Sequence, residues 1–157
     1  MYLDEQVDKS MRRGGFTPEF LREVENKRRE LAAMFAIENL TKQAKRVLRD
    51  RFAPTWVKDI VLDVASAHGV SALDMVLDCR VKKVVKARNE AIYFVKYAKQ
   101  KLSLKQVARW FGKDHTSILH AIACHSEMTG APRLTHYDIE RVRNTNRQSA
   151  RKRKDAR

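Results

Sequence analysis

Apolar side chains recur at intervals of three and four residues along most of this chain, which is the spacing of one face of an α-helix. The pattern is clearest from Val57 to Ala65 and from Val84 to Ala98. The chain has only 5 Gly and 3 Pro in 157 residues, too few for a turn-rich β protein. We therefore predict an all-α fold, and the apolar fraction of 43% is enough for one compact core.

Helix start and stop signals divide this pattern into segments. Residues that commonly cap helix N-termini precede four of the segments: Thr17, Ser71, Ser103 and Asp114. Glycines that suit helix C-termini follow three of them: Gly69, Gly112 and Gly130. These signals predict helices over 17–52 (one helix or two), 55–68, a short stretch from 71, 84–101, 103–110, 114–126 and 135–142. A basic connection, residues 80–83, precedes the helix that starts near residue 84.

The charge of the chain points to a polyanionic partner. Lys and Arg number 33 against 19 Asp and Glu, which gives a formal net charge of +14. The net charge is +3 over residues 1–54, +6 over 55–126 and +5 over 127–157, so the excess lies in the centre and the tail. A simple soluble basic protein is the alternative, but such an excess is more typical of nucleic-acid binding.

Residues 103–126 have the spacing of a helix-turn-helix, because Gly112 separates two short helical segments. The second segment begins with five consecutive hydrogen-bonding residues, Lys113 to Ser117. Free backbone N–H groups at a helix N-terminus favour phosphate, and short polar side chains there can meet base edges. We predict that this helix reads DNA.

The run Phe-Gly-Lys-Asp-His-Thr-Ser-Ile-Leu-His-Ala, from Phe111 to Ala121, resembles a known family signature. The C-terminal DNA-binding domain of the bacterial replication initiator DnaA has Phe-Gly-Gly-Arg-Asp-His-Thr-Thr-Val-Leu-His-Ala. The order of helices and basic loop upstream is similar too, so the resemblance covers about residues 55–126. It implies a Trp-repressor-like helix-turn-helix bundle that binds double-stranded DNA, with an AT-rich nonamer as the first site to test.

The resemblance also implies roles for individual residues. Asp114, His115 and Thr116 look like the readers of bases in the major groove, and Arg80 like the arginine that enters the minor groove. Arg88 and Lys96 are similar in position to phosphate contacts of the family. The complete set of predicted DNA-binding residues is Arg80, Lys82, Lys83, Lys86, Arg88, Asn89, Lys96, Lys113, Asp114, His115, Thr116 and Ser117.

Other chemistries find little support in the sequence. The chain has no Gly-rich phosphate loop, so we expect no nucleotide and no complete initiator ATPase. His120 and Cys124 share a helical face, but no second pair supplies further ligands, so we expect no metal and no cofactor. No catalytic groups converge, so we expect no enzyme. An RNA-binding protein would share the charge, but the basic cluster lacks stacking aromatics.

We divide the chain into a flexible leader, 1–16, a helical arm, 17–53, a DNA-binding domain, 55–126, and an extension, 127–157, with a basic disordered tail. The N-terminus resembles no signal peptide and no stretch suits a membrane span, so we expect a cytoplasmic protein associated with the nucleoid. We predict sequence-specific DNA binding that regulates replication or transcription.

The role of the arm is left open between two alternatives. Leu21, Val24, Leu31 and Phe35 recur at helical spacing, although Arg28 interrupts the stripe. The stripe packs on the protein's own core, or it binds a partner or a second copy through residues 17–52. In the second case, the alternative function is a protein-interaction module that contacts replication proteins.

Overall fold

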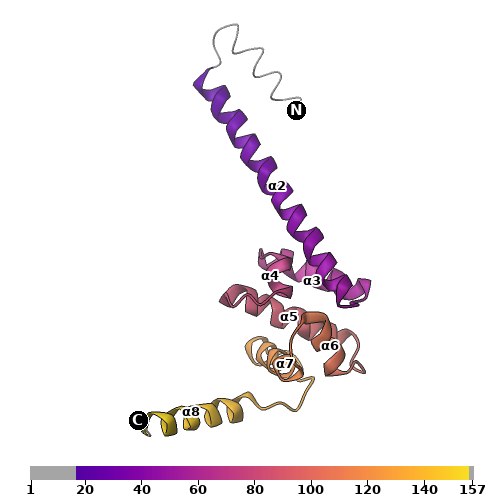
Figure 1. Cartoon of the computed structure of the whole chain (residues 1–157), viewed down its shortest axis with the longest axis vertical. Helices are drawn as coiled ribbons and strands as arrows, with labels where there is room; N and C mark the ends of the chain where they lie inside the picture. Colours follow the sequence, from indigo (N-terminus) through magenta and orange to yellow (C-terminus); the bar gives the residue numbers. More distant parts are fainter. Residues whose placement is uncertain (1–16, 156–157) are drawn as a thin grey trace. The chain divides into compact units, whose positions relative to one another are not determined.

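The structure, a computed structural model, describes residues 17–155 as seven helices without strands (Figure 1). The prediction of an all-α fold is thereby confirmed. The predicted leader, 1–16, lies outside the described residues. The described chain falls into two parts, residues 17–39 and residues 40–155, and each is described by itself. This boundary lies inside the predicted arm rather than at its end.

Helix α2 (Pro18–Asp50) is one helix, not two. Its N-terminus is capped as predicted, because the Phe20 backbone N–H donates to Thr17 Oγ1 at 3.3 Å. In the part up to residue 39, most apolar side chains are exposed, and surface ion pairs such as Lys27 with Glu23, at 3.1 Å, lie along the helix.

The second part is built around α5 (Lys82–Ala98). This helix packs against α3 (Thr55–His68), α4 (Ala72–Val76), α6 (Leu104–Phe111) and α7 (His115–Thr129). The last turns of α2 contribute Ala44 and Leu48, both fully buried, to the same core. Other large side chains without solvent exposure are Met75, Val57, Val61, Val95, Val107, Phe111, Ile118 and Ile122. Each such burial contributes about 1.5–3 kcal/mol, and this core fixes the helix-turn-helix.

Two tryptophans join the start of α3 to the end of α6. The rings of Trp56 and Trp110 meet edge to face, with centroids 6.0 Å apart and an interplanar angle of 89°. Trp110 is buried and Trp56 is partly buried against the core. Both rings therefore belong to the core.

The predicted capping residues act as predicted. Ser71 Oγ accepts from the Leu73 N–H and Ser103 Oγ from the Gln106 N–H, each at 3.2 Å. Gly69 and Gly112 close α3 and α6 in the left-handed conformation. Helix α5 begins at Lys82, so the basic connection is shorter than expected. The loop between α4 and α5, residues 77–81, keeps only Arg80 of that connection's basic residues and also holds Asp78; it is called the basic loop below, after the prediction.

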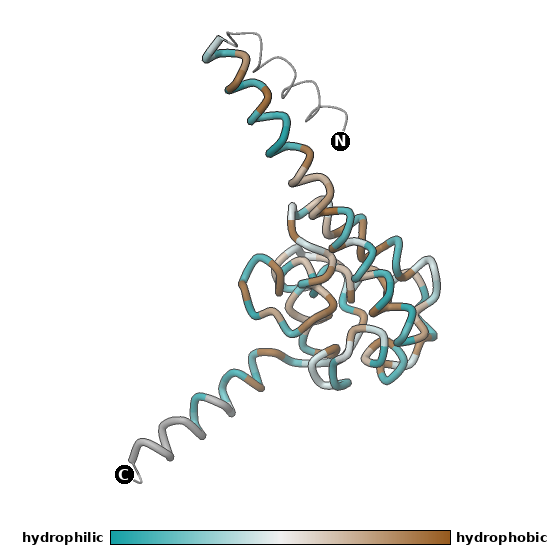
Figure 2. The backbone as a smooth tube through the Cα atoms, turned by 45° about the horizontal axis from the view of Figure 1, so that its top comes forward, coloured by the Kyte–Doolittle hydropathy of each residue, from teal (hydrophilic) through white to brown (hydrophobic). Residues whose placement is uncertain are grey.

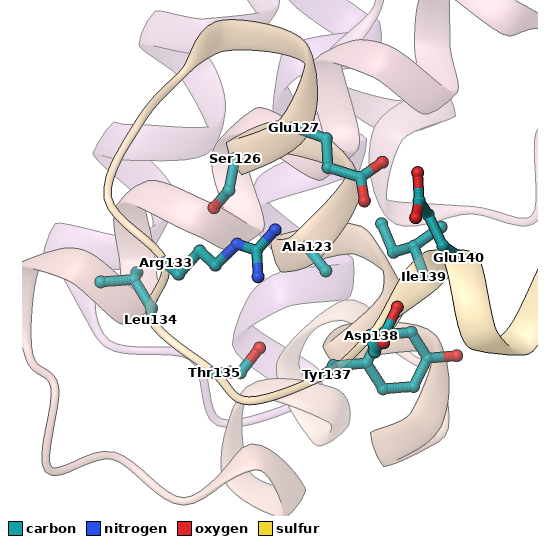
Figure 3. Close-up of a pocket in the computed structure, with 10 residues that line it drawn as sticks. All are labelled: Ala123, Ser126, Glu127, Arg133, Leu134, Thr135, Tyr137, Asp138, Ile139 and Glu140. Carbon is teal, nitrogen blue, oxygen red and sulfur yellow. The ribbon is translucent and has the colours of Figure 1, made fainter.

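The C-terminal extension differs most from the prediction, because α8 (Ile139–Asp155) continues where we expected a disordered tail. No Gly or Pro follows Pro132, and Arg, Lys, Gln and Ala are good helix formers, so even this polar sequence is compatible with a helix. Ile139 is only 1% exposed, and Arg143 pairs with Glu127 of α7 at 3.6 Å. Between α7 and the segment that enters α8 lies a hollow of about 430 Å³ (Figure 3).

Candidate nucleic-acid interface

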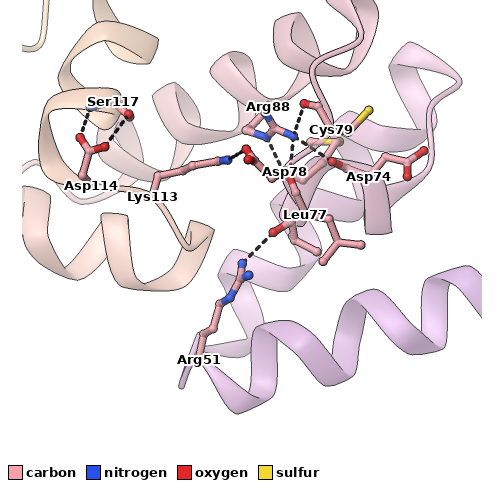
Figure 4. Close-up of polar contacts among 11 residues, drawn as sticks. Arg51, Asp74, Leu77, Asp78, Cys79, Arg88, Lys113, Asp114 and Ser117 are labelled. Carbon is pink, nitrogen blue, oxygen red and sulfur yellow. Dashed lines mark hydrogen bonds and ion pairs between the residues drawn. The ribbon is translucent and has the colours of Figure 1, made fainter.

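The first turn of α7 is organised by Asp114. Its carboxylate accepts from the Thr116 hydroxyl. It also accepts from the Ser117 backbone N–H at 2.7 Å and from the Ser117 hydroxyl at 3.0 Å (Figure 4). The hydrogen bond from Thr116, followed by those from Ser117, holds the pKa of Asp114 well below its usual range. The structure therefore gives Asp114 an N-capping role in addition to any contact it makes with a ligand.

We expect Asp114→Ala to lower the melting temperature, because α7 then lacks its cap. The pKa of Asp114 in the folded protein lies below its unfolded value of about 3.9. The stabilisation by the ionised cap is therefore complete above about pH 3.9 and is lost as pH falls through the folded pKa. The difference in melting temperature from wild type should stay constant from about pH 7 to 5 and shrink below about pH 4. Calorimetry across this range measures it.

Ser103→Ala is the matched control, since it removes the cap of α6 without removing a titratable group. Its melting-temperature difference should stay the same throughout the pH range. A difference for Asp114→Ala that is equally independent of pH would contradict the capping role of the ionised carboxylate.

Lys113 links the turn of the helix-turn-helix to the basic loop. Its ammonium donates to the Asp78 carboxylate, as Figure 4 shows. Lys113 lowers the pKa of Asp78 by this hydrogen bond and by its charge, and the charge of Arg80 adds to the effect. The Lys113 side chain is 19% exposed, so a phosphate contact by Lys113 would have to compete with Asp78.

Arg51 is a residue of this region that the sequence analysis missed. Its Nη1 donates to the Val76 carbonyl at 2.8 Å and to the Trp110 carbonyl at 3.4 Å. Partial burial lowers the pKa of its guanidinium. The guanidinium lies directly against Gly112, so the end of α2 supports the turn between α6 and α7. Nothing in the local pattern distinguishes this arginine from others near helix ends.

Arg88 does not lie at the surface, contrary to the prediction of a phosphate contact. It is 7% exposed and donates to four backbone carbonyls at the end of α4 and in the basic loop (Figure 4). Nε reaches the Met75 oxygen at 2.6 Å, and Nη2 reaches those of Asp74, Leu77 and Cys79 at 2.8–2.9 Å. Desolvation lowers its pKa. Its position suits holding the basic loop in shape rather than binding a ligand.

Lys96 has partners within the chain as well. Its ammonium donates to the carbonyls of Gln100 and Leu102, at 2.5 and 2.6 Å, and so satisfies acceptors just after α5 ends. The side chain is half-buried, as is that of Asn89. That Lys96 and Asn89 contact DNA stays a prediction.

The remaining predicted residues are exposed and come from three neighbouring elements. The basic loop supplies one, the first two turns of α5 supply three and the start of α7 supplies three: Arg80, then Lys82, Lys83 and Lys86, then His115, Thr116 and Ser117. A hollow of about 560 Å³ runs from the beginning of the basic loop to the beginning of α7. Together these exposed residues are called the turn–loop surface.

Comparison with known proteins gives this helix-turn-helix a family. Residues 57–124 match the model of the bacterial dnaA protein helix-turn-helix. This region is a DnaA-type helix-turn-helix domain. The relationship inferred from the run Asp114 to Thr116 is thereby confirmed, and the DnaA-type domain comprises α4 to α6 with nearly all of α3 and most of α7.

Three relatives illustrate the extent of the similarity. The chromosomal replication initiator protein DnaA of Xanthobacter autotrophicus is 34% identical over 103 residues, which are 62% of this chain and 20% of the relative. Its counterparts in Brucella abortus (32% over 85 residues) and Rickettsia canadensis (34% over 87 residues) match 54 and 55% of this chain, and 17 and 19% of their own lengths. The chain thus spans about a fifth or less of these relatives. No solved structure matches it.

Two features are absent from the described residues, 17–155. None of the helices is both long and apolar enough to cross a membrane. Within the same range, no three His, Cys, Asp or Glu side chains gather as a metal site would require. His120 and Cys124 do approach each other, with Nε2 and Sγ 3.3 Å apart.

Proposed function

We propose that the DnaA-type domain binds double-stranded DNA in a sequence-specific manner through the turn–loop surface and that it acts in replication or transcription. The family match supports DNA binding, because the relatives are named as chromosomal replication initiators. The observation that carries the proposal is the Lys113–Asp78 pair, because it joins the turn before the exposed first turn of α7 to the loop that bears Arg80. One duplex can then face both elements.

In this proposal, α7 enters the major groove with its N-terminus first. His115 and Thr116 present ring nitrogens and a hydroxyl to base edges, while Asp114 holds the first turn in place. Arg80 reaches the adjacent minor groove from the exposed tip of the basic loop. Lys82, Lys83 and Lys86 neutralise phosphates and set the register of the protein on the duplex.

Selection of binding sites from a duplex library with a random core, in about 0.15 M salt, tests the proposal directly. Enrichment of one sequence, expected to be AT-rich by resemblance to the family, would support specific DNA binding. Binding without enrichment would reduce the function to non-specific association with nucleic acid. Preference for RNA over duplex DNA in competition would contradict the proposal.

We expect His115→Ala and Lys83→Ala to weaken binding in different ways. His115→Ala should cost about 1–3 kcal/mol on the selected site and reduce discrimination, because it removes a contact to a base. Lys83→Ala should weaken binding to all duplexes alike and reduce the salt slope by about 1, because it removes a contact to a phosphate. Fluorescence anisotropy on the selected site and on a scrambled duplex separates the two effects. Equal losses on both duplexes for His115→Ala would argue against base reading.

A further inference from the structure

The part of α2 before residue 40 carries a stripe of large apolar side chains at its surface. Leu21, Leu31 and Phe35 are 43, 44 and 64% exposed, and the hydropathy colours alternate along this helix (Figure 2). Around Phe35, a hollow of about 330 Å³ is lined by Leu31, Met34, Ile37 and Glu38. Clustered apolar exposure of this kind is typical of a surface that another polypeptide covers.

The spacing of the stripe identifies the kind of polypeptide that fits it. Positions 21, 24, 28, 31, 35 and 38 follow one another in alternating steps of three and four, as the a and d positions of a coiled coil do. Four of the six positions are apolar, and the other two hold Arg28 and Glu38. Charged side chains at such positions reduce stability but specify register and orientation.

We propose that two copies of the chain pair in an antiparallel coiled coil through residues 28–38, the C-terminal part of this stripe. In antiparallel pairing, each a position faces a d position of the second copy. The register that places Arg28 opposite Glu38 of the second copy also places Leu31 opposite its Phe35. Two-fold symmetry repeats both pairs, so the centre consists of two apolar layers between two ion pairs.

Parallel pairing does not fit the same stripe. It would stack Arg28 on Arg28 and Glu38 on Glu38, and like charges face to face cost several kcal/mol in an interface. Ala32 lies beside the centre of the antiparallel arrangement and lets the helices approach closely, while Met34 extends the apolar contact. Because the paired segment is short, dimerisation depends on protein concentration. If the proposed function holds, each dimer carries two DNA-binding domains.

Exchanging the two charges tests the proposal. Sedimentation equilibrium of the full chain without DNA should show a monomer–dimer equilibrium. Arg28→Glu and Glu38→Arg should each raise the dissociation constant about tenfold or more, because each variant pairs like charges. An equimolar mixture of the two variants, and the double variant, should regain dimerisation. Arg29→Glu is the matched control, because it makes the same charge change outside the stripe, and it should leave dimerisation unchanged.

A chain that stays monomeric at all concentrations would overturn the proposal. This holds also if a different partner covers the stripe. Single variants that dimerise as well as wild type would also overturn it. That result would indicate parallel pairing, in which residue 28 faces residue 28 and residue 38 faces residue 38, so that every single variant keeps the like-charge contacts of wild type. Far-UV circular dichroism checks that α2 stays helical. Anisotropy on a single DNA site separates this result from the proposed function, because the substitutions leave residues 40–155 unchanged.

Discussion

Replacing Arg88 by Met should destabilise the second part of the chain by about 3–5 kcal/mol. The guanidinium donates to four backbone carbonyls from Asp74 to Cys79, and Met keeps the volume while removing every donor. Buried acceptors left without donors each cost about 1–3 kcal/mol, although such costs do not add fully. Urea unfolding followed by circular dichroism measures the loss.

Lys86→Met provides a matched control for Arg88→Met. It removes one positive charge from the same helix, but Lys86 is exposed, so the stability should change by no more than about 0.5 kcal/mol. Its affinity for DNA should fall instead, because the proposal assigns Lys86 to a phosphate. If the Arg88→Met protein had wild-type stability and weakened DNA binding, the structural role of Arg88 would be contradicted. Arg88 would then be assigned to a phosphate contact.

The parts of the fold that could be predicted depend on contacts within a few residues. Ser103 and Asp114 cap their helices through backbone N–H groups three residues away, and Gly112 ends α6 because a left-handed residue is needed there. These interactions involve only local geometry, so residue type and spacing suffice to infer them. The same local chemistry placed the helix-turn-helix.

The directions of individual basic side chains could not be predicted in this way. Arg88 and Lys86 belong to one helix and one charge cluster, yet one is buried and the other exposed. The acceptors of Arg88 lie 9 to 14 residues earlier in the chain, and those of Arg51 lie 25 and 59 residues later. Their positions depend on how α4 and α6 pack, which periodicity alone does not determine.

The helical structure of the C-terminal tail could not be predicted for a different reason. Its composition favours both a disordered polyelectrolyte and a helix, since Arg and Lys are polar and also good helix formers. The hydrophobic pattern contains one strong anchor, Ile139, which is buried where α8 begins. An isolated apolar residue gives little periodic signal, so the sequence predicts a last helix that ends at Val142 rather than at Asp155.

Replacing Gly112 by Ala should destabilise the protein by about 2–5 kcal/mol, because two costs combine at this turn. Gly112 has a φ of 61°, and the left-handed conformation costs an L residue about 1–2 kcal/mol. A Cβ there would also lie 2.6 Å from Arg51 Cζ and Nη2. The guanidinium would have to move and give up its bonds to Val76 and Trp110, which are worth about 0.5–1.5 kcal/mol each.

Two further variants separate the costs at Gly112. Gly130→Ala has a similar φ of 70° but meets no atom within 4 Å, so it should show only the backbone cost of about 1–2 kcal/mol. In a cycle with Arg51→Ala, the Gly112→Ala penalty should fall by about 1–3 kcal/mol, because the steric conflict is then absent. Strictly additive losses would mean that Arg51 and Gly112 are energetically independent. The end of α2 would then have no demonstrated influence on the turn that positions α7.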